Sequence, residues 1–141
     1  MEIKKAAKWF LSKEPMTHRK LQSLLYYSYC THLVFHETKL FSEKFQGWST
    51  GPIALSIFDE FKDYRNSKIP QGEAPEVKVS KDELRVLGYV WRVYGRFEDK
   101  DLRKLISGDD PWRISREGLN PIENGNRTIT DKDIYNYYAA P

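Results

Sequence analysis

Apolar residues recur along the chain at intervals of three and four residues, which is the spacing of one helix face. These stretches are separated by segments rich in proline, glycine and asparagine. The longest begins at Thr17, a predicted N-cap, and stays apolar over a wide arc for about five turns, to Phe35. A helix of this length and composition is predicted to lie at the centre of the molecule.

Helical spacing is lost between Lys39 and Gly51, where aromatic residues alternate with glycine breaks. This segment is predicted to form a small β-hairpin or an extended excursion. Pro52 is predicted to occupy the first position of the next helix, where its missing amide costs nothing. Residues 66–76 are the most loop-like stretch, and residues 77–79 are predicted as one short strand.

Polar residues mark the starts of the later helices. Ser80 and Glu83 form a capping box, in which each side chain bonds the backbone amide of the other. Asp99, Asp110 and Thr130 are predicted to be N-caps of three further helices. The pattern therefore predicts a mainly α fold of about seven helices with a small β-hairpin or short strand element.

The composition supports one compact helical domain spanning residues 1–141. The chain is 40% hydrophobic and 14% aromatic, which is enough for one core at this length. Its formal net charge of +3 neither shows nor excludes a nucleic-acid surface. The single Cys30 has no internal disulfide partner, and no segment is typical of a signal peptide or a membrane span. We therefore expect a cytoplasmic protein without a membrane partner.

Few residues are arranged for chemistry. His32 and His36 share one helix face at the spacing of a zinc pair, but no third ligand is indicated, and Glu37 follows the pair instead of lying inside it. Adjacent acids are more typical of caps and solvated faces than of catalytic pairs; they are Asp59–Glu60, Glu98–Asp99 and Asp109–Asp110. We expect no catalytic residue, no metal site and no cofactor.

The chain is rich in aromatic residues, with four tryptophans and nine tyrosines. Two adjacent residues on a helix cannot both face one core, so some rings of Tyr26–Tyr27 and Tyr137–Tyr138 are expected to reach the surface or a groove. Exposed tyrosine and tryptophan are typical of protein interfaces.

Two blocks of residues resemble the Panacea domain, also called the SocA-like antitoxin domain. The motif positions are Lys20, Leu21, Leu24, Tyr26, Tyr27, Phe41, Trp48, Gly51, Pro52, Pro111 and Trp112. The likeness extends from about Thr17 to Tyr138, with Gly47 where the family commonly has alanine. Most motif positions are expected to be structural: Trp48 anchors the hairpin, Gly51 supplies an unusual backbone angle and Pro111 starts a helix.

The resemblance implies an antitoxin that neutralises a cognate toxin, encoded by an adjacent gene, through direct contact. One branch of the family implies an alternative, a proteolytic adaptor that delivers the toxin to the ClpXP protease. The contact surface is expected among exposed residues that vary within the family. The candidates for partner binding are Tyr29, Tyr64, Arg65, Trp91, Arg92 and Arg96.

Two other classes of function stay open. The positive balance and the arginine–aromatic segment from Trp91 to Phe97 favour a nucleic-acid-binding transcriptional regulator as a further alternative, although the modest charge makes nucleic acid a disfavoured partner. An enzyme is the least favoured, because no set of nucleophile, base and orienting residue is present.

Overall fold

The computed structural model describes residues 1–75 and 79–140. They form seven α-helices, one 3-10 helix and a two-stranded antiparallel sheet, so the predicted mainly α class is confirmed. The helices are α1 (Ile3–Leu11), α2 (His18–His36), α3 (Leu55–Phe61), η1 (Lys62–Tyr64), α4 (Lys81–Tyr94), α5 (Asp99–Ser107), α6 (Asp110–Ser115) and α7 (Asp131–Tyr138). The strands are β1 (Gln46–Trp48) and β2 (Gly51–Ile53).

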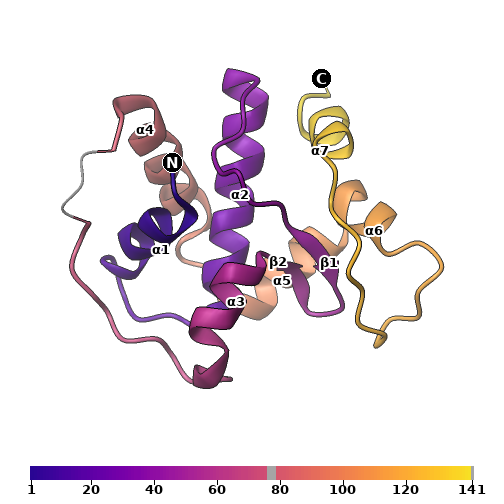
Figure 1. Ribbon diagram of the computed structural model, residues 1–141, viewed down its shortest axis with the longest axis horizontal. Helices are drawn as coiled ribbons and strands as arrows, with labels where there is room; N and C mark the ends of the chain where they lie inside the picture. Colours follow the sequence, from indigo (N-terminus) through magenta and orange to yellow (C-terminus); the bar gives the residue numbers. More distant parts are fainter. Residues whose placement is uncertain (76–78, 141) are drawn as a thin grey trace.

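Helix α2 runs through the middle of the molecule, as predicted (Figure 1). It buries 14 of its 19 residues and contacts α1, α3, α4, α5, α7 and β2. The Thr17 hydroxyl accepts from the amide of Lys20 at 3.2 Å, which confirms the predicted cap. A helix with so many neighbours must be apolar around most of its circumference, and this explains the wide apolar arc in its sequence.

The predicted β-hairpin is confirmed, and it extends further than expected. Its register pairs Gln46 with Ile53, Gly47 with Pro52 and Trp48 with Gly51. The prediction that Pro52 starts a helix is wrong, because Pro52 lies in β2 and α3 begins at Leu55. The third segment of this region is residues 127–129: Gly47 donates to the carbonyl of Arg127 at 3.0 Å, and Ile129 donates to that of Phe45 at 2.8 Å.

Two side chains distant in sequence determine where α3 begins. The carboxylate of Glu43 accepts from the amide of Ser56 at 2.9 Å, so it satisfies an otherwise unpaired donor in the first helical turn. Gln22 of α2 bonds both backbone groups of Ala54, accepting from its amide at 2.9 Å and donating to its carbonyl at 3.0 Å. These contacts fix the helix start after the hairpin has ended.

The capping box of α4 is confirmed, with both reciprocal bonds between Ser80 and Glu83 at 3.2 Å. The cap of α7 is also confirmed, because the Thr130 hydroxyl accepts from the amide of Asp133 at 3.2 Å. The strand predicted over residues 77–79 falls largely outside the described residues, and Val79 has no regular secondary structure.

The predicted caps at Asp99 and Asp110 are wrong by one residue. The N-cap positions are Glu98 and Asp109, and each predicted residue is the first of its helix. The carboxylate of Asp99 instead accepts from the Thr17 hydroxyl at 2.8 Å and so ties the start of α5 to the start of α2.

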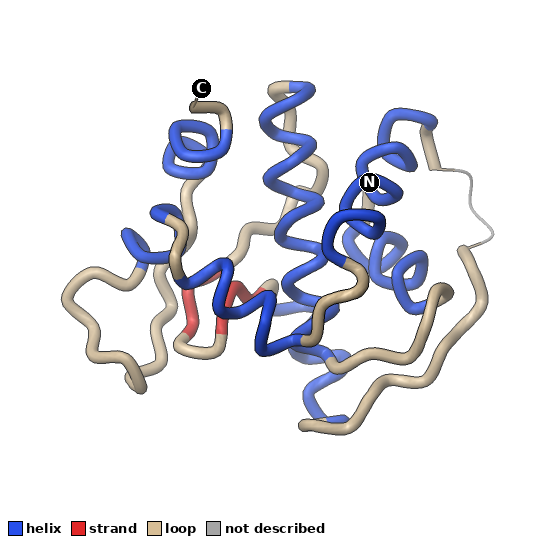
Figure 2. Tube along the Cα trace, turned by 180° about the vertical axis from the view of Figure 1, so that it is seen from behind, coloured by secondary structure: helices blue, strands red, loops and turns tan. Residues whose placement is uncertain are grey.

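The two long connections lie on opposite sides of the molecule (Figures 1 and 2). The connection after η1 is held against the loop before α2 by Met16 and Ile69, whose backbones exchange two hydrogen bonds of 3.2 and 2.7 Å. The connection between α6 and α7 runs past the hairpin on the other side. Each therefore presents a separate surface.

Candidate functional site

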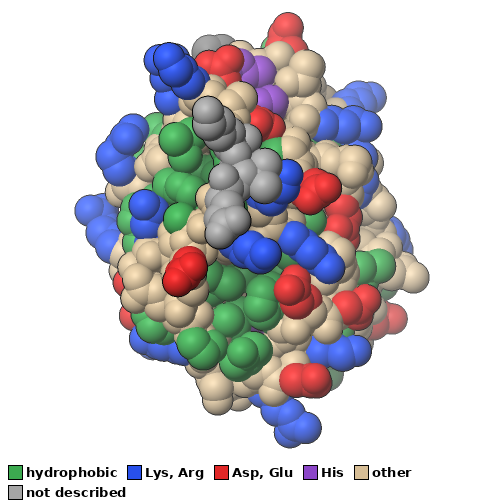
Figure 3. All heavy atoms as spheres, turned by 60° about the vertical axis from the view of Figure 1, so that its left-hand side comes forward, with side chains coloured by type: hydrophobic (Ala, Val, Ile, Leu, Met, Phe, Trp, Pro, Cys, Tyr) green, Lys and Arg blue, Asp and Glu red, His purple; other side chains and the backbone are tan. Residues whose placement is uncertain are grey.

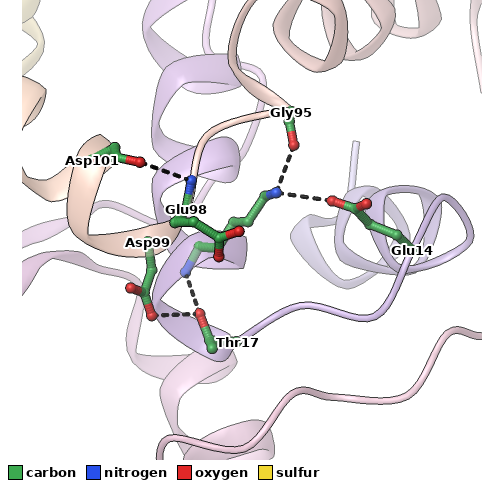
Figure 4. A network of polar contacts seen from close by, with 7 residues as sticks. Glu14, Thr17, Gly95, Glu98, Asp99 and Asp101 are labelled. Carbon is green, nitrogen blue, oxygen red and sulfur yellow. Dashed lines mark hydrogen bonds and ion pairs between the residues drawn. The ribbon is translucent and has the colours of Figure 1, made fainter.

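The motif residue Lys20 lies inside the fold, where it holds several elements together. Its side chain is only 8% exposed, and Nζ donates to the carbonyl of Gly95 at 2.6 Å and pairs with Glu14 at 2.9 Å. The ring of Trp91 lies 5.6 Å from the same ammonium. Figure 4 shows the contacts with Gly95, just after α4, and with Glu14, in the loop after α1.

The motif residues of the hairpin join it to two helices. Trp112 of α6 donates from its indole nitrogen to the carbonyl of Trp48 at 3.0 Å, and the ring of Trp48 lies 4.8 Å from that of Phe58 in α3. Gly51 has a φ of 127°, which confirms the predicted unusual backbone angle. Pro111 lies in the first turn of α6, as predicted.

Some rings of the tyrosine doublets were expected to reach the surface or a groove, and Tyr27, although only 4% exposed, lines a hollow of about 140 Å³ together with Tyr94 and Tyr138. Tyr26 is fully buried at 0%. Tyr27 stacks on Tyr94 of α4 with ring centroids 3.9 Å apart, and Tyr26 packs edge-on to Phe45 at 5.5 Å. Tyr137 at the end of the chain is 37% exposed.

The prediction that Tyr29 is exposed is wrong, because only 1% of it is accessible. Its hydroxyl donates to Asp131 of α7 at 2.5 Å and accepts from Lys44 at 3.0 Å. Burial, and then the hydrogen bond to the carboxylate, raise the pKa of Tyr29 to about 12. Tyr29 therefore fastens α7 to the central helix.

The other candidates for partner binding lie apart from one another. Tyr64 and Arg65 are exposed at the end of η1, and Trp91 is half-buried against Phe10 and Lys20. The guanidinium of Arg96 lies on the ring of Phe97, a position separate from the groove that Arg92 lines.

A groove of about 620 Å³ lies between the end of α2 and the outer face of α4. Phe35 and Tyr89 meet edge to face across it at 6.3 Å and are 65% and 39% exposed. Leu84 adds apolar surface and Arg92 lies in the lining, while Gly88 leaves part of the wall open. Figure 3, which brings the α1 and α4 side forward, shows hydrophobic side chains on the surface with lysine and arginine among them.

Phe35, Leu84 and Tyr89 are interface candidates that the sequence analysis missed. Phe35 and Leu84 occupy apolar positions of the helical pattern, which gives the residues on one face but not where the neighbouring helices end. Tyr89 carried the only available signal. It is an aromatic residue one position away from Val90 in the apolar stripe of α4, so it faces outward.

A second candidate surface is the connection between α6 and α7. Ile122 at its tip is 89% exposed. Beside the tip lies a polar hollow of about 440 Å³, lined among others by Trp48, Leu119 and Arg127. Unlike the groove, this surface protrudes.

His32 and His36, which have the spacing of a zinc pair, have ring centroids 4.7 Å apart on α2. His32 donates from Nδ1 to the carbonyl of Thr38 at 2.9 Å, which occupies one ring nitrogen. Over residues 1–75 and 79–140, no three side chains of histidine, cysteine, aspartate or glutamate come together in a way that could hold a metal.

Comparison with known proteins gives one match. A family model described as antitoxin SocA-like, Panacea domain, matches residues 21–113, which include most of α2, the hairpin, α3, α4, α5 and the start of α6. No curated protein and no solved structure matches the chain. Across the described part of the chain, no helix has both the length and the apolar character needed to cross a membrane.

Proposed function

The chain belongs to the SocA-like antitoxin family that carries the Panacea domain, and we propose that it is the antitoxin of a toxin–antitoxin pair. The observation that carries this proposal is the family match over residues 21–113. We propose further that the toxin is a protein encoded by an adjacent gene, and that neutralisation occurs by direct binding.

The geometry supports binding better than catalysis. The strongly displaced pKa values belong to tyrosine and cysteine side chains, and burial inside the fold is the first cause of each shift. Burial, with nearby Tyr26 and Cys30, raises the pKa of Tyr138, which also donates to Asp109 at 2.6 Å. The exposed apolar side chains at the groove and at the tip of the α6–α7 connection are the kind of surface that protein partners cover.

The available surface is sufficient for a stable complex. Such a complex buries about 600–1,000 Å² on each partner. The described chain exposes 8134 Å², so roughly a tenth of its surface is enough. Of the predicted contact residues, we retain Tyr64, Arg65, Trp91, Arg92 and Arg96 as candidates and withdraw Tyr29.

The test is co-expression with the product of the adjacent gene. Expression of that product alone should arrest growth, and co-expression of this chain should restore it. An inactive variant of the toxin should co-purify with the chain as one species in gel filtration. Continued growth arrest together with separate elution would contradict the proposal.

The same assay separates direct neutralisation from delivery to ClpXP. In a host that lacks the protease, direct binding predicts that rescue persists. An adaptor predicts that rescue is lost and that the toxin, which is degraded faster in the normal host when this chain is present, becomes stable.

A nucleic-acid-binding regulator is the second candidate, favoured by Lys81, Arg85 and Arg92 beside Phe35 and Tyr89 on the groove of α4. Binding driven by phosphate contacts weakens steeply as salt rises. An electrophoretic shift assay over a salt series with the DNA upstream of the gene tests this candidate, and no shift at low salt would exclude it.

A further inference from the structure

The connection between α6 and α7 is fixed from inside by one arginine. Arg116 is only 7% exposed. Its guanidinium donates to the carbonyl oxygens of Gly47 at 3.2 Å, Asn120 at 3.0 Å and Glu123 at 2.6 Å. A planar group that bonds three carbonyls at once holds both sides of the loop against the hairpin. The loop is therefore ordered although it contains no helix or strand.

Residues 120–123, which are called the tip of this loop, form a tight turn that carries Ile122. The side-chain oxygen of Asn120 accepts from the amides of Ile122 at 3.1 Å and Glu123 at 3.2 Å. Pro121 lies between Asn120 and Ile122, and its ring restricts its own φ. Ile122 is 89% exposed, which is the largest value among the exposed large hydrophobic residues of the described chain.

Single apolar residues on a protein surface are common and need no function. Ile122 differs because the backbone that carries it is already held by Arg116 and Asn120. A partner that buries this side chain would lose little binding free energy to ordering the loop. A protruding aliphatic group on a preorganised loop fits a concave apolar pocket of about its own size.

The position of the loop relative to the family match also favours a role in contacting a partner. The match ends at residue 113, and the loop begins at Arg116. Recognition of one particular partner depends on residues that distinguish one member of a family from another. The loop lies just beyond the residues that the family model matches, and on the opposite side of the molecule from α4 (Figure 1).

We propose that Ile122 enters an apolar pocket on the toxin and is a principal contact of the complex. This inference rests on the proposed antitoxin function and adds the contact residue and the chemistry of the complementary site. The hollow beside the tip, between Trp48 and Arg127, would receive the rim of that pocket. The groove between α2 and α4 is the competing surface.

The experiment measures the affinity of the full chain for the inactive toxin by calorimetry. Full burial of an isoleucine corresponds to roughly a tenfold to hundredfold change in Kd. Ile122→Ala should weaken binding by about that factor, and Ile122→Asp should abolish it. Asn120→Ala keeps the isoleucine but frees the turn, so it should weaken binding by about threefold to tenfold.

Two controls keep the result specific. Both Ile122 variants should keep the melting temperature of the wild type, because the side chain is exposed and only its backbone amide is bonded. Gly88→Gln fills the competing groove, where a Cβ would meet nothing closer than the Arg92 guanidinium at 4.0 Å, and it should bind the toxin like the wild type.

Binding of Ile122→Asp within twofold of the wild type would overturn the proposal. It would equally be overturned if the wild type self-associates, Ile122→Asp is monomeric and toxin binding is unchanged, since the isoleucine would then serve a second copy of the chain. Failure of the wild type itself to bind would instead remove the proposed function on which this inference rests.

Discussion

At the scale of single residues, Gly51 shows how backbone conformation alone can demand a particular amino acid. Its φ of 127° lies in a region that residues with a side chain rarely adopt, yet a Cβ added there would meet no atom within 4 Å. The requirement therefore comes from strain and not from lack of space. The sequence indicated this, since Gly51 ends the aromatic segment of the hairpin.

We predict that Gly51→Ala lowers the free energy of unfolding by about 1–3 kcal/mol, the cost of holding a non-glycine residue in this region. Gly88→Ala is the matched control. Its φ is ordinary and its position is helical, so the same substitution should raise the free energy of unfolding by about 0.5–1 kcal/mol. Urea unfolding followed by tryptophan fluorescence measures both. Equal effects of the two substitutions would contradict the assignment of strain to Gly51.

Asp131 is the residue whose charge matters most for the attachment of α7. Burial opposes its ionisation, but the hydrogen bonds from Lys44 at 2.6 Å and Tyr29 at 2.5 Å outweigh burial and hold the pKa of Asp131 below its ordinary value of 3.8. A carboxyl group with a lowered pKa in the folded state stabilises the fold above its unfolded pKa. This contribution is lost as the pH falls from that value through the folded pKa.

We therefore predict that Asp131→Asn lowers the free energy of unfolding by about 1 kcal/mol at pH 7, since the pair is partly solvated. The difference from the wild type should shrink as the pH falls below about 4. Asp59→Asn is the control, because Asp59 makes only a 3.9 Å surface pair with Lys62 and should change little at either pH. A difference between Asp131→Asn and wild type that is independent of pH would contradict the charge-based explanation.

At the scale of elements, the hairpin packs closely against α6, with Gly47 of β1 next to Ser115. A Cβ at Gly47 would lie 1.9 Å from the hydroxyl oxygen of Ser115 and 3.0 Å from its Cβ. The glycine at this position is thus explained by Ser115, a residue beyond the segment that the family model matches. In this chain Ser115 fills the space that an alanine methyl would need.

We predict that Gly47→Ala destabilises the protein by about 1–3 kcal/mol through overpacking. Ser115→Gly removes both clashing atoms at the cost of its own hydrogen bond to the carbonyl of Trp112. The double variant should therefore be more stable than the sum of the two single effects, by about 1–2 kcal/mol of coupling energy. Chemical unfolding of all four proteins completes the cycle, and additive effects would show that the contact is not tight.

The sequence separation between a helix cap and its partner determines whether the cap can be predicted from the sequence. The caps at Thr17, Ser80 and Thr130 were found because each bonds a group within three residues, so the signal is local. Asp99 was placed one residue away from the actual N-cap because its partner is Thr17, 82 residues distant. Pro52 was misplaced because β2 continues through it, which is a consequence of pairing with Gly47.

At the scale of the whole molecule, the segments outside the family match complete the core. Ile3 of α1 and Ile134 of α7 belong to the same buried cluster as α2. The described helices from both ends of the chain therefore share one core. Tyr29 was taken for a surface residue because its partner, Asp131, is 102 residues distant and α7 had no predicted position. Candidate contacts such as Ile122 depend on how the chain closes, which no local pattern encodes.

Lys20 of α2 bonds both the loop after α1 and the residue after α4. Its burial favours a structural role over a role in binding a partner. Its ammonium serves the carbonyl of Gly95 and the carboxylate of Glu14, and its methylene stem packs among buried residues near Trp91. We predict that Lys20→Ala lowers the free energy of unfolding by about 2–4 kcal/mol, because it leaves a cavity and an unpaired carbonyl.

Lys20→Met should lose less than Lys20→Ala because it keeps the packing of the stem, although the Gly95 carbonyl and the partly exposed Glu14 carboxylate both lose their donor. Glu14→Gln should cost less than about 1 kcal/mol, since the Glu14 side chain is 43% exposed and water replaces much of its interaction. Toxin affinity of the folded Lys20→Met variant should equal that of the wild type. Weakened binding with unchanged stability would instead place Lys20 at the interface, against its 8% exposed side chain.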